Sequence, residues 1–356
     1  MENIKQWFNR VLTNPEALAL LGTLLVVFLA ILWVGDVLSP VLASIVIAYL
    51  LEGMVVKFQS LGLTRKLAVI VSFSLFMALL SYMVFGLIPL LSIQTVQLAQ
   101  QLPTMLNQGI HLFMALPEKY PNFITEDQVK MIFDQVSTEA IKFGQSLLTF
   151  SAASVLNIVA LIVYLLLVPM MVYFFLQDKA EITRWFASLL PANSRLTVEV
   201  WSTVNGQIAN YVRGKIWEIL IVWAACFIAF KFLGLNYAVL LSFLVGLSVL
   251  VPYIGATVVT IPVLLVAYFQ WSWGNEFIYL TSVFFVIQAL DGYVLVPLLF
   301  SEVVNIHPVA IIVAILFFGG IWGFWGVFFA IPLATLVQAV LVAWPTRYNE
   351  INSSTE

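Results

Sequence analysis

The sequence predicts an all-α polytopic membrane protein with about eight membrane segments, two of which are hairpin-like stretches broken by Gly and Pro. Hydrophobic residues make up 62% of the 356 residues, charged residues make up only 9%, and the mean hydropathy is +1.04. Roughly a quarter of the residues of an ordinary soluble domain are charged. The apolar residues also gather into runs of about 20, the length that a helix needs to cross a bilayer.

Six apolar runs have the length of a single span or come close to it, and two are longer. The six are Ala17–Gly35, Val37–Leu51, Leu67–Leu91, Ser151–Leu176, Ile216–Leu233 and Phe277–Phe300. The second of these needs residues 53–58 to complete a span. The two longer runs, Tyr237–Phe269 and Val309–Trp344, exceed one span and contain Gly and Pro, which predicts that each is broken.

Most Lys and Arg residues lie in alternate connections between the spans, and the three lysines of segment 92–150 on the other side are outnumbered there by five acidic residues. The residues in the alternate connections are Lys5 and Arg10 before the first span, Lys57, Arg65 and Lys66 after the second, and Lys179, Arg184, Arg195, Arg213 and Lys215 after the fourth. By the positive-inside rule these connections face the cytoplasm. The C-terminus with Arg347 falls on the same side, so both termini are predicted to be cytoplasmic.

Polar stretches divide the chain into five parts. These are N-terminal membrane helices (1–91), a periplasmic amphipathic insert (92–150), a fourth membrane helix (151–177), a cytoplasmic or interfacial helical arm (178–215) and a C-terminal transport core (216–345). Apolar residues at helical spacing predict two or three helices in the insert, punctuated by Pro103, Pro117 and Pro121. The insert is either a structural cap, an oligomer contact or a ligand-binding element. Pro191 divides the arm, whose aromatic and cationic residues suit the headgroup plane.

The transport core shows an internal match at an offset of about 70 residues. Leu235–Asn236 aligns with Ile306–His307, Gly255 with Gly326, and Ile261–Pro262 with Ile331–Pro332. In the predicted topology each half consists of one span and one hairpin, and the two halves have opposite orientation. Inverted repeats with broken helices are a recurrent transporter design, and their solute site lies near the bilayer midplane.

The two breaks are candidate solute-site elements because unpaired backbone in a membrane must meet water, protein or a ligand. Their residues include Pro252, Gly255, Gly319, Gly320, Gly323, Gly326 and Pro332. Close helix packing at small residues is an alternative explanation for the glycines. A topology in which both long runs cross the bilayer fully also satisfies the charge rule.

Asp291 is the outstanding polar residue, because it lies inside the apolar run Phe277–Phe300. A charge at the bilayer centre is costly and usually faces a cavity or a partner. Gln288 lies three residues earlier, on the same helical face. The pair is predicted to handle a solute or an ion, and a hydrogen bond that packs two helices together is the alternative.

Other polar residues are weaker candidates. Glu218 and Glu52 lie near span ends, from which side chains can reach water. His307 stands at a hairpin start before Pro308, where it either stabilises the turn or relays protons. Cys226, the single cysteine, is interpreted as a small buried hydrophobe.

No enzyme motif is found in the sequence. It lacks the His-Glu-x-x-His, phosphate-loop, dinucleotide and Gly-x-Ser-x-Gly patterns. Two histidines and one cysteine make a metal site improbable, and no cofactor is predicted. The net charge of −3 and the absence of a basic run argue against nucleic acid as a partner.

Five segments carry motifs that belong together, namely Pro169–Asp178, Val251–Gly255, Gln288–Pro297, Asn305–Pro308 and Gly323–Pro332. In combination they resemble the autoinducer-2 exporter family of permeases. Within that family, the run Leu298–Pro308 is most similar to the PerM-type permeases of Gram-negative bacteria. The resemblance covers nearly the whole chain and implies a bacterial inner-membrane exporter of small molecules. Some members of that family are credited with the export of autoinducer-2, and others with sodium/proton exchange. Gln288, Asp291 and Pro297 match its motifs, but Ser301-Glu302 replaces a Gly-Lys type pair, which puts the substrate in doubt.

The residues and the resemblance together predict a permease that exports a small polar solute or signal, autoinducer-2-like and coupled to an ion, H⁺ in the first instance. The predicted partners are the small-molecule substrate, the lipid bilayer and further copies of the chain in a homo-oligomer. A sodium/proton antiporter, with Asp291 binding either cation, is the alternative. A membrane scaffold that transports nothing and recruits a partner through the periplasmic insert is the second alternative.

Overall fold

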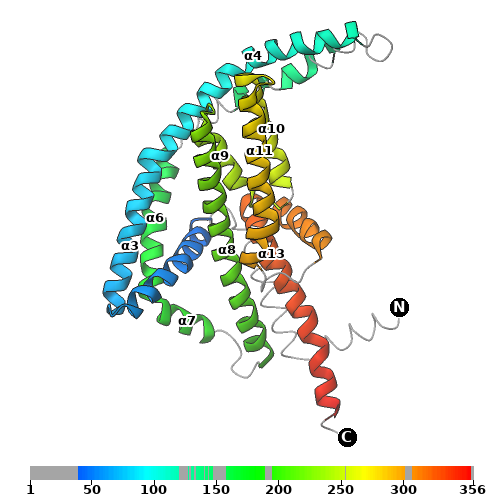
Figure 1. The fold of residues 1–356 in the computed structure, drawn as a ribbon. Coiled ribbons are helices and arrows are strands. Elements are labelled where there is room, and N and C mark those ends of the chain that lie inside the picture. Colours follow the sequence, from blue (N-terminus) through cyan, green and yellow to red (C-terminus); the bar gives the residue numbers. More distant parts are fainter. Residues whose placement is uncertain are drawn as a thin grey trace.

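The computed structural model describes residues 39–119, 127, 130–131, 134–139, 141–142, 144–146, 158–188, 195–252, 254–300 and 307–353. Within these ranges the chain is helical and contains no β-strand, which confirms the predicted all-α class. Figure 1 shows two groups of helices, joined at their upper end by a long bent helix. The predicted first span, Ala17–Gly35, lies outside the described residues.

Six described helices are long and apolar enough to cross a membrane, or up to seven spans if a bent pair, Ile162–Gln177 with Lys179–Trp185, is counted as one. The described part of the chain therefore does not reach the predicted number of about eight. The six are Ser39–Ser60, Arg65–Gly109, Gly206–Leu233, Ile254–Trp271, Asn275–Phe300 and Pro308–Gln338.

The first group consists of the helix Ser39–Ser60, α3 (Arg65–Tyr82) and α6 (Ile158–Gln177). Their shared core is formed by Ala48, Leu51, Val55, Ala68, Val69, Val172 and Leu176. Large apolar side chains on the outer faces, such as Leu79 and Leu166, are exposed. Helices that are apolar on both faces suit a protein whose surrounding solvent is lipid.

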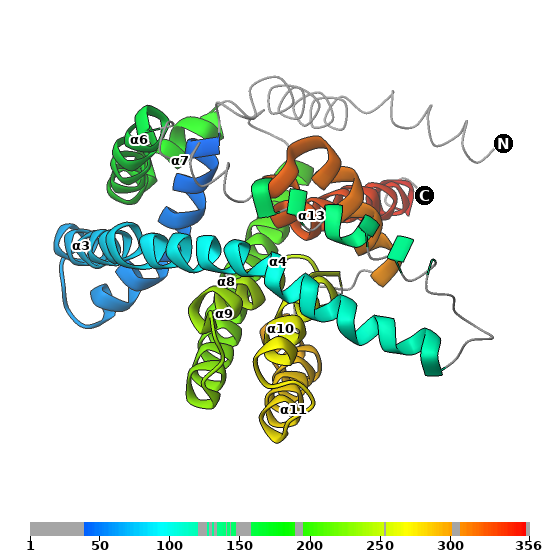
Figure 2. The ribbon, with the colours of Figure 1, turned by 90° about the horizontal axis from the view of Figure 1, so that it is seen from above.

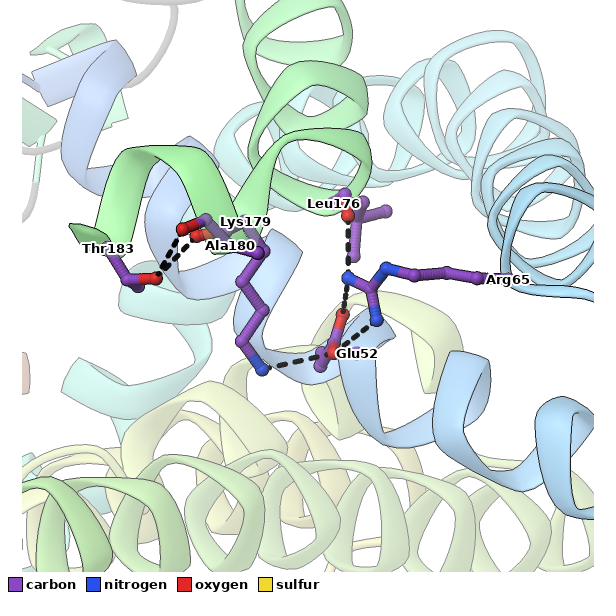
Figure 3. Close-up of polar contacts among 6 residues, drawn as sticks. All are labelled: Glu52, Arg65, Leu176, Lys179, Ala180 and Thr183. Atoms are coloured by element: carbon purple, nitrogen blue, oxygen red, sulfur yellow. Dashed lines mark hydrogen bonds and ion pairs between the residues drawn. The ribbon is translucent and has the colours of Figure 1, made fainter. Parts of the chain in front are cut away.

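Glu52 joins three elements of this group (Figure 3). Its carboxylate accepts hydrogen bonds from Arg65 at 3.3 Å and from Lys179 at 3.0 Å, and Arg65 also donates to the carbonyl oxygen of Leu176 at 2.9 Å. An 84° bend between α6 and α7 (Lys179–Ser188) accompanies these contacts. Glu52 is therefore neutralised by cations from neighbouring elements, whereas the sequence suggests only a side chain that reaches water.

The third predicted span does not end at Leu91. The helix α3 continues through a π-helix, η1 (Met83–Leu87), into α4 (Ile88–Lys119). Pro103 and Pro117 lie inside α4 and do not divide it as predicted, because one proline removes a single hydrogen bond and can bend a helix without ending it. Seen from above, α4 crosses over the second group of helices (Figure 2).

The predicted arm and the predicted fifth span share one continuous helix, α8 (Arg195–Leu233). The part of α8 that is apolar enough to cross a membrane begins at Gly206, earlier than the predicted Ile216. In the sequence, the charge of Arg213 suggests that the span begins after it. In the structure, Arg213 lies within the span, and its guanidinium lies over the Tyr49 ring, 5.5 Å from the ring centre. This extension places Glu218 in the middle of the span, about 18 Å from its start.

The second group is built around α8. One core joins α8 to α9 (Ala238–Ser248), α10 (Ile254–Trp271) and α11 (Asn275–Leu290). A second core joins α8 to both parts of α13 (Pro308–Ser353). The helices α8 and α11 pack together and run in opposite directions (Figure 1).

Both long apolar runs of this group are broken, as the sequence predicts. The chain leaves helical conformation between α9 and α10, and within α13 at Gly323, which has φ 55° and ψ −128°. Gly255 and Gly326 follow the two breaks. A Cβ at Gly255 would overlap the carbonyl oxygen of Ser248, and one at Gly326 would overlap that of Phe318. The two glycines aligned by the internal match thus meet the same steric constraint.

We expect Gly326→Ala to destabilise the protein by about 1 to 3 kcal/mol, because the added methyl group forces the backbone apart at the break. Gly255→Ala should have a similar effect. The matched control is Gly320→Ala, since nothing lies within 4 Å of a Cβ added there. Apparent melting temperatures of the purified variants in detergent test this, and an equal loss in the control would contradict the steric explanation.

Candidate functional site

Asp291 begins a π-helical turn, η2 (Asp291–Leu295), between α11 and α12 (Val296–Phe300). Its carbonyl oxygen accepts a hydrogen bond from the backbone N–H of Val296, five residues on. Single π-turns inside α-helices occur frequently at functional sites. The Asp291 side chain is 9% exposed, and its Oδ1 has no hydrogen-bond partner in the described part of the chain.

A buried ion pair lies on α8, the helix that packs against this turn. The ammonium of Lys215 lies 2.8 Å from Oε2 of Glu218, and the two side chains are 5% and 3% exposed. The two residues stand at i and i+3, a spacing that places side chains together on one helical face. A pair buried this deeply is strongly destabilised when one partner is removed.

The charges of the α8 pair and of Asp291 interact. Lys215 acts electrostatically on Asp291, and the Asp291 carboxylate acts in turn on Glu218 and Cys226. The other packed elements α9, α10 and α12, and α13 as far as Gln338, contain no Asp, Glu, Lys or Arg. The Lys215 ammonium is bonded to Glu218, so the three side chains together carry one excess negative charge when all of them are ionised.

Aromatic rings close one side of this group. The Phe300 ring centre lies 5.6 Å from the Lys215 ammonium and 5.7 Å from the ring centre of Tyr211. Gly214 allows this approach, because a Cβ there would come within 3.0 Å of the Phe300 ring. The Tyr211 hydroxyl is buried and has no partner among the described residues. A cation held between a carboxylate and an aromatic face is a favourable arrangement.

Gln288 lies one turn before Asp291, and neither its amide oxygen nor its amide nitrogen has a hydrogen-bond partner among the described residues. Its backbone carbonyl accepts from the Asp291 N–H. Buried polar groups normally have partners, and each exception calls for an explanation such as a bound water, ion or ligand. Gln288 and Asp291 thus offer one donor group and several acceptors that the described protein leaves unused.

The other candidates lie elsewhere in the core. Pro252 and Gly255 lie at the α9–α10 break. The bend of α13 is surrounded by Gly319, Gly320, Gly323 and Gly326. Pro332 lies in the second part of α13. Pro297 is exposed on α12. His307 is exposed, and its Nδ1 accepts a hydrogen bond from the Val309 N–H at 3.3 Å. That bond stabilises the start of α13, which agrees with the turn explanation for His307.

Sequence reasoning did not identify Lys215, Tyr211 or Phe300, and it placed Glu218 at a span end. A signal was present, since Lys215 and Glu218 are spaced as an i, i+3 ion pair directly after a glycine. The positive-inside rule assigned Lys215 to a loop because the rule considers each cation without its partner. In the structure, this pair lies on α8, the helix that packs against the turn that begins at Asp291.

We expect Lys215→Met to lower the stability by about 3 to 5 kcal/mol, because it leaves Glu218 buried and unpaired. Adding Glu218→Gln should restore part of the loss. Lys142→Met is the matched control: Lys142 and Glu139 also form an i, i+3 pair at 2.8 Å, but both side chains are more than 60% exposed. That control should change stability by less than about 1 kcal/mol. Equal shifts in the two apparent melting temperatures would contradict the assignment of a buried pair.

The sequence comparisons agree with this architecture. Residues 21–346 match the AI-2E family transporter model. The chain is 44% identical over 345 residues to the permease PerM of Escherichia coli K12, covering 97% of this chain and 98% of PerM. It is 24% identical to the transport protein YueF of Bacillus subtilis, covering 90% of each chain, and 23% identical to a transport protein of Thermotoga maritima, covering 92% and 94%. The chain therefore belongs to the AI-2E family of membrane transporters.

Proposed function

We propose that this transporter exports a small polar solute or signalling molecule, of the autoinducer-2 type, and couples export to the entry of a proton at Asp291. The observation that carries the proposal is the uncompensated carboxylate of Asp291 beside the Lys215–Glu218 pair. An isolated charge in an apolar interior is expensive, so such a group either takes up a cation or is neutralised by a proton.

This charge balance supplies a coupling mechanism. With Asp291 ionised, the contact between α8 and η2 carries a net negative charge that favours water or a cation nearby. With Asp291 protonated, the contact becomes neutral and can close. A site that favours one arrangement when charged and the other when neutral can bias a two-state equilibrium, which is the requirement for coupling.

The two breaks are the proposed solute-binding elements. The segments around Pro252 and Gly323 interrupt helical hydrogen bonding in the two hairpins of the second group. Carbonyl and N–H groups freed at such breaks can bind a polar solute without any charged side chain. This division assigns solute recognition to the backbone of the hairpins and ion coupling to the α8–η2 contact.

Sodium/proton exchange remains the second candidate because it would use the same carboxylate. Asp291 and Glu218 together offer carboxylate oxygens, the hard ligands that alkali and alkaline-earth cations prefer. In that case sodium and a proton would compete for Asp291, and no organic solute would be required. The periplasmic scaffold alternative needs neither cation.

We expect everted vesicles that carry the protein to show solute-dependent proton movement that Asp291→Asn abolishes. The measurement is interior pH reported by a fluorescent dye, with an autoinducer-type furanone and sodium added in separate experiments. Glu276→Gln is the matched control, because Glu276 is an exposed acid in the first turn of α11, the same helix that leads to Asp291. The control should transport like the wild type.

The outcomes separate the candidates. A furanone response lost only in Asp291→Asn supports proton-coupled export, and a sodium response lost only in that variant supports exchange. A response of either kind that persists in Asp291→Asn would rule out the assignment of Asp291. Silence toward both additions, with the protein correctly inserted, would count against ion-coupled transport of these substrates.

A further inference from the structure

The two polar sites of the core stand at similar places in the internal repeat, two residues out of register with the aligned glycines. Lys215 and Glu218 are spaced i, i+3 on α8, and Gln288 and Asp291 have the same spacing at the end of α11. Each member of the second pair follows its counterpart by 73 residues, close to the 71 residues that separate Gly255 from Gly326. The helices that carry the two pairs pack against each other and run in opposite directions, as the spans of an inverted repeat do (Figure 1).

The two pairs differ at one position. In the first, the carboxylate of Glu218 has a tethered ammonium, that of Lys215, at 2.8 Å. In the second, the neutral amide of Gln288 stands where the first pair has its lysine. Asp291 is 9% exposed, against 2% for Glu218, and its Oδ1 and both amide atoms of Gln288 have no hydrogen-bond partner among the described residues.

We propose that Gln288 and Asp291 form a seat for one free monovalent cation, which takes the place that the Lys215 ammonium holds beside Glu218. The occupant is a proton on the Asp291 carboxylate or a small cation such as sodium held by that carboxylate and the Gln288 amide oxygen. The inference deepens the proposed function, on which it rests for its role in transport. The seat itself can be tested without any transport measurement.

The repeat suggests a direct test, in which Gln288→Lys gives the second pair the tethered cation of the first. In the wild type, Asp291→Asn removes an uncompensated charge, so the apparent melting temperature should stay unchanged or rise. In the Gln288→Lys background, Asp291→Asn leaves the new ammonium buried and unpaired, so the melting temperature should fall by about 5 °C. The effect of Asp291→Asn on the melting temperature should therefore be neutral or stabilising in the wild type and destabilising in the Gln288→Lys background.

Gln288→Met is the matched control, because it replaces the amide by a side chain of similar length without a charge. In that background Asp291→Asn should behave as it does in the wild type. The purified full-length protein in detergent is used throughout. If Asp291→Asn has the same effect in the Gln288→Lys background as in the wild type, the seat is not equivalent to the first pair and the proposal is wrong.

A second measurement applies even if Gln288→Lys does not fold. The melting temperature of the wild type should rise when sodium replaces choline at constant ionic strength, or when the pH is lowered, and Asp291→Asn should remove that response. The other titratable groups that face the seat, Lys215, Glu218, Tyr211 and Cys226, remain present in the variant and serve as the internal control.

The sodium and pH measurements together identify the occupant of the seat. A response of the melting temperature to sodium indicates a metal cation, and a response to pH alone indicates a proton. A wild type that responds to neither would overturn the seat. Vesicles that show no transport while purified protein keeps the sign reversal would overturn the proposed function and leave the seat intact.

Discussion

The ion pair between Lys215 and Glu218 is the interaction on which the C-terminal half depends. Two charges can stay at this depth only if they are held together and every competing geometry is excluded. The continuous helix α8 fixes both residues on one face, Gly214 lets Phe300 cover the ammonium, and the Tyr211 ring packs on Phe300. The packing of α12 on α8 is therefore also what shields the pair.

Two ionic groups in the described part of the chain differ in their charge balance. Around Glu52, one carboxylate meets two cations whose side chains are 39% and 49% exposed, so any excess charge is hydrated. Near Asp291, the Lys215 ammonium is bonded to Glu218, Asp291 Oδ1 has no partner among the described residues, and all three residues are buried. The first group fastens helix ends together, whereas the second retains an excess charge that only a cation or a proton can remove.

The helical class and the positions of the two breaks could be predicted from the sequence, because each rests on local composition or spacing, whereas a role for Asp291 in transport stays a prediction. The continuity of α3 with α4 and of the arm with α8 could not be predicted. Pro103 and Arg213 look like boundaries when only their neighbours in sequence are considered. In the structure the helix α8 continues through Arg213, whose guanidinium lies over the Tyr49 ring of another helix. The burial of Lys215 could not be predicted for the same reason. Its partner Glu218 lies on the same helix, but the Phe300 ring that covers its ammonium is distant in sequence.

The internal match of the sequence has a structural counterpart at the two breaks. The equivalent glycines Gly255 and Gly326 are constrained alike, by a backbone carbonyl that leaves no room for a Cβ, so both halves keep the same break. The Lys215–Glu218 pair lies on α8, which packs against α11 and against the η2 turn that begins at Asp291, and only the first of the two sites has an ammonium of its own. A lysine in place of Gln288 would give Asp291 a cation within its own helix and remove the excess negative charge. With glutamine at position 288, this contact has one charge pair and one carboxylate without a cation of its own, and the proposed coupling requires that the charge of this carboxylate bias an equilibrium between two arrangements.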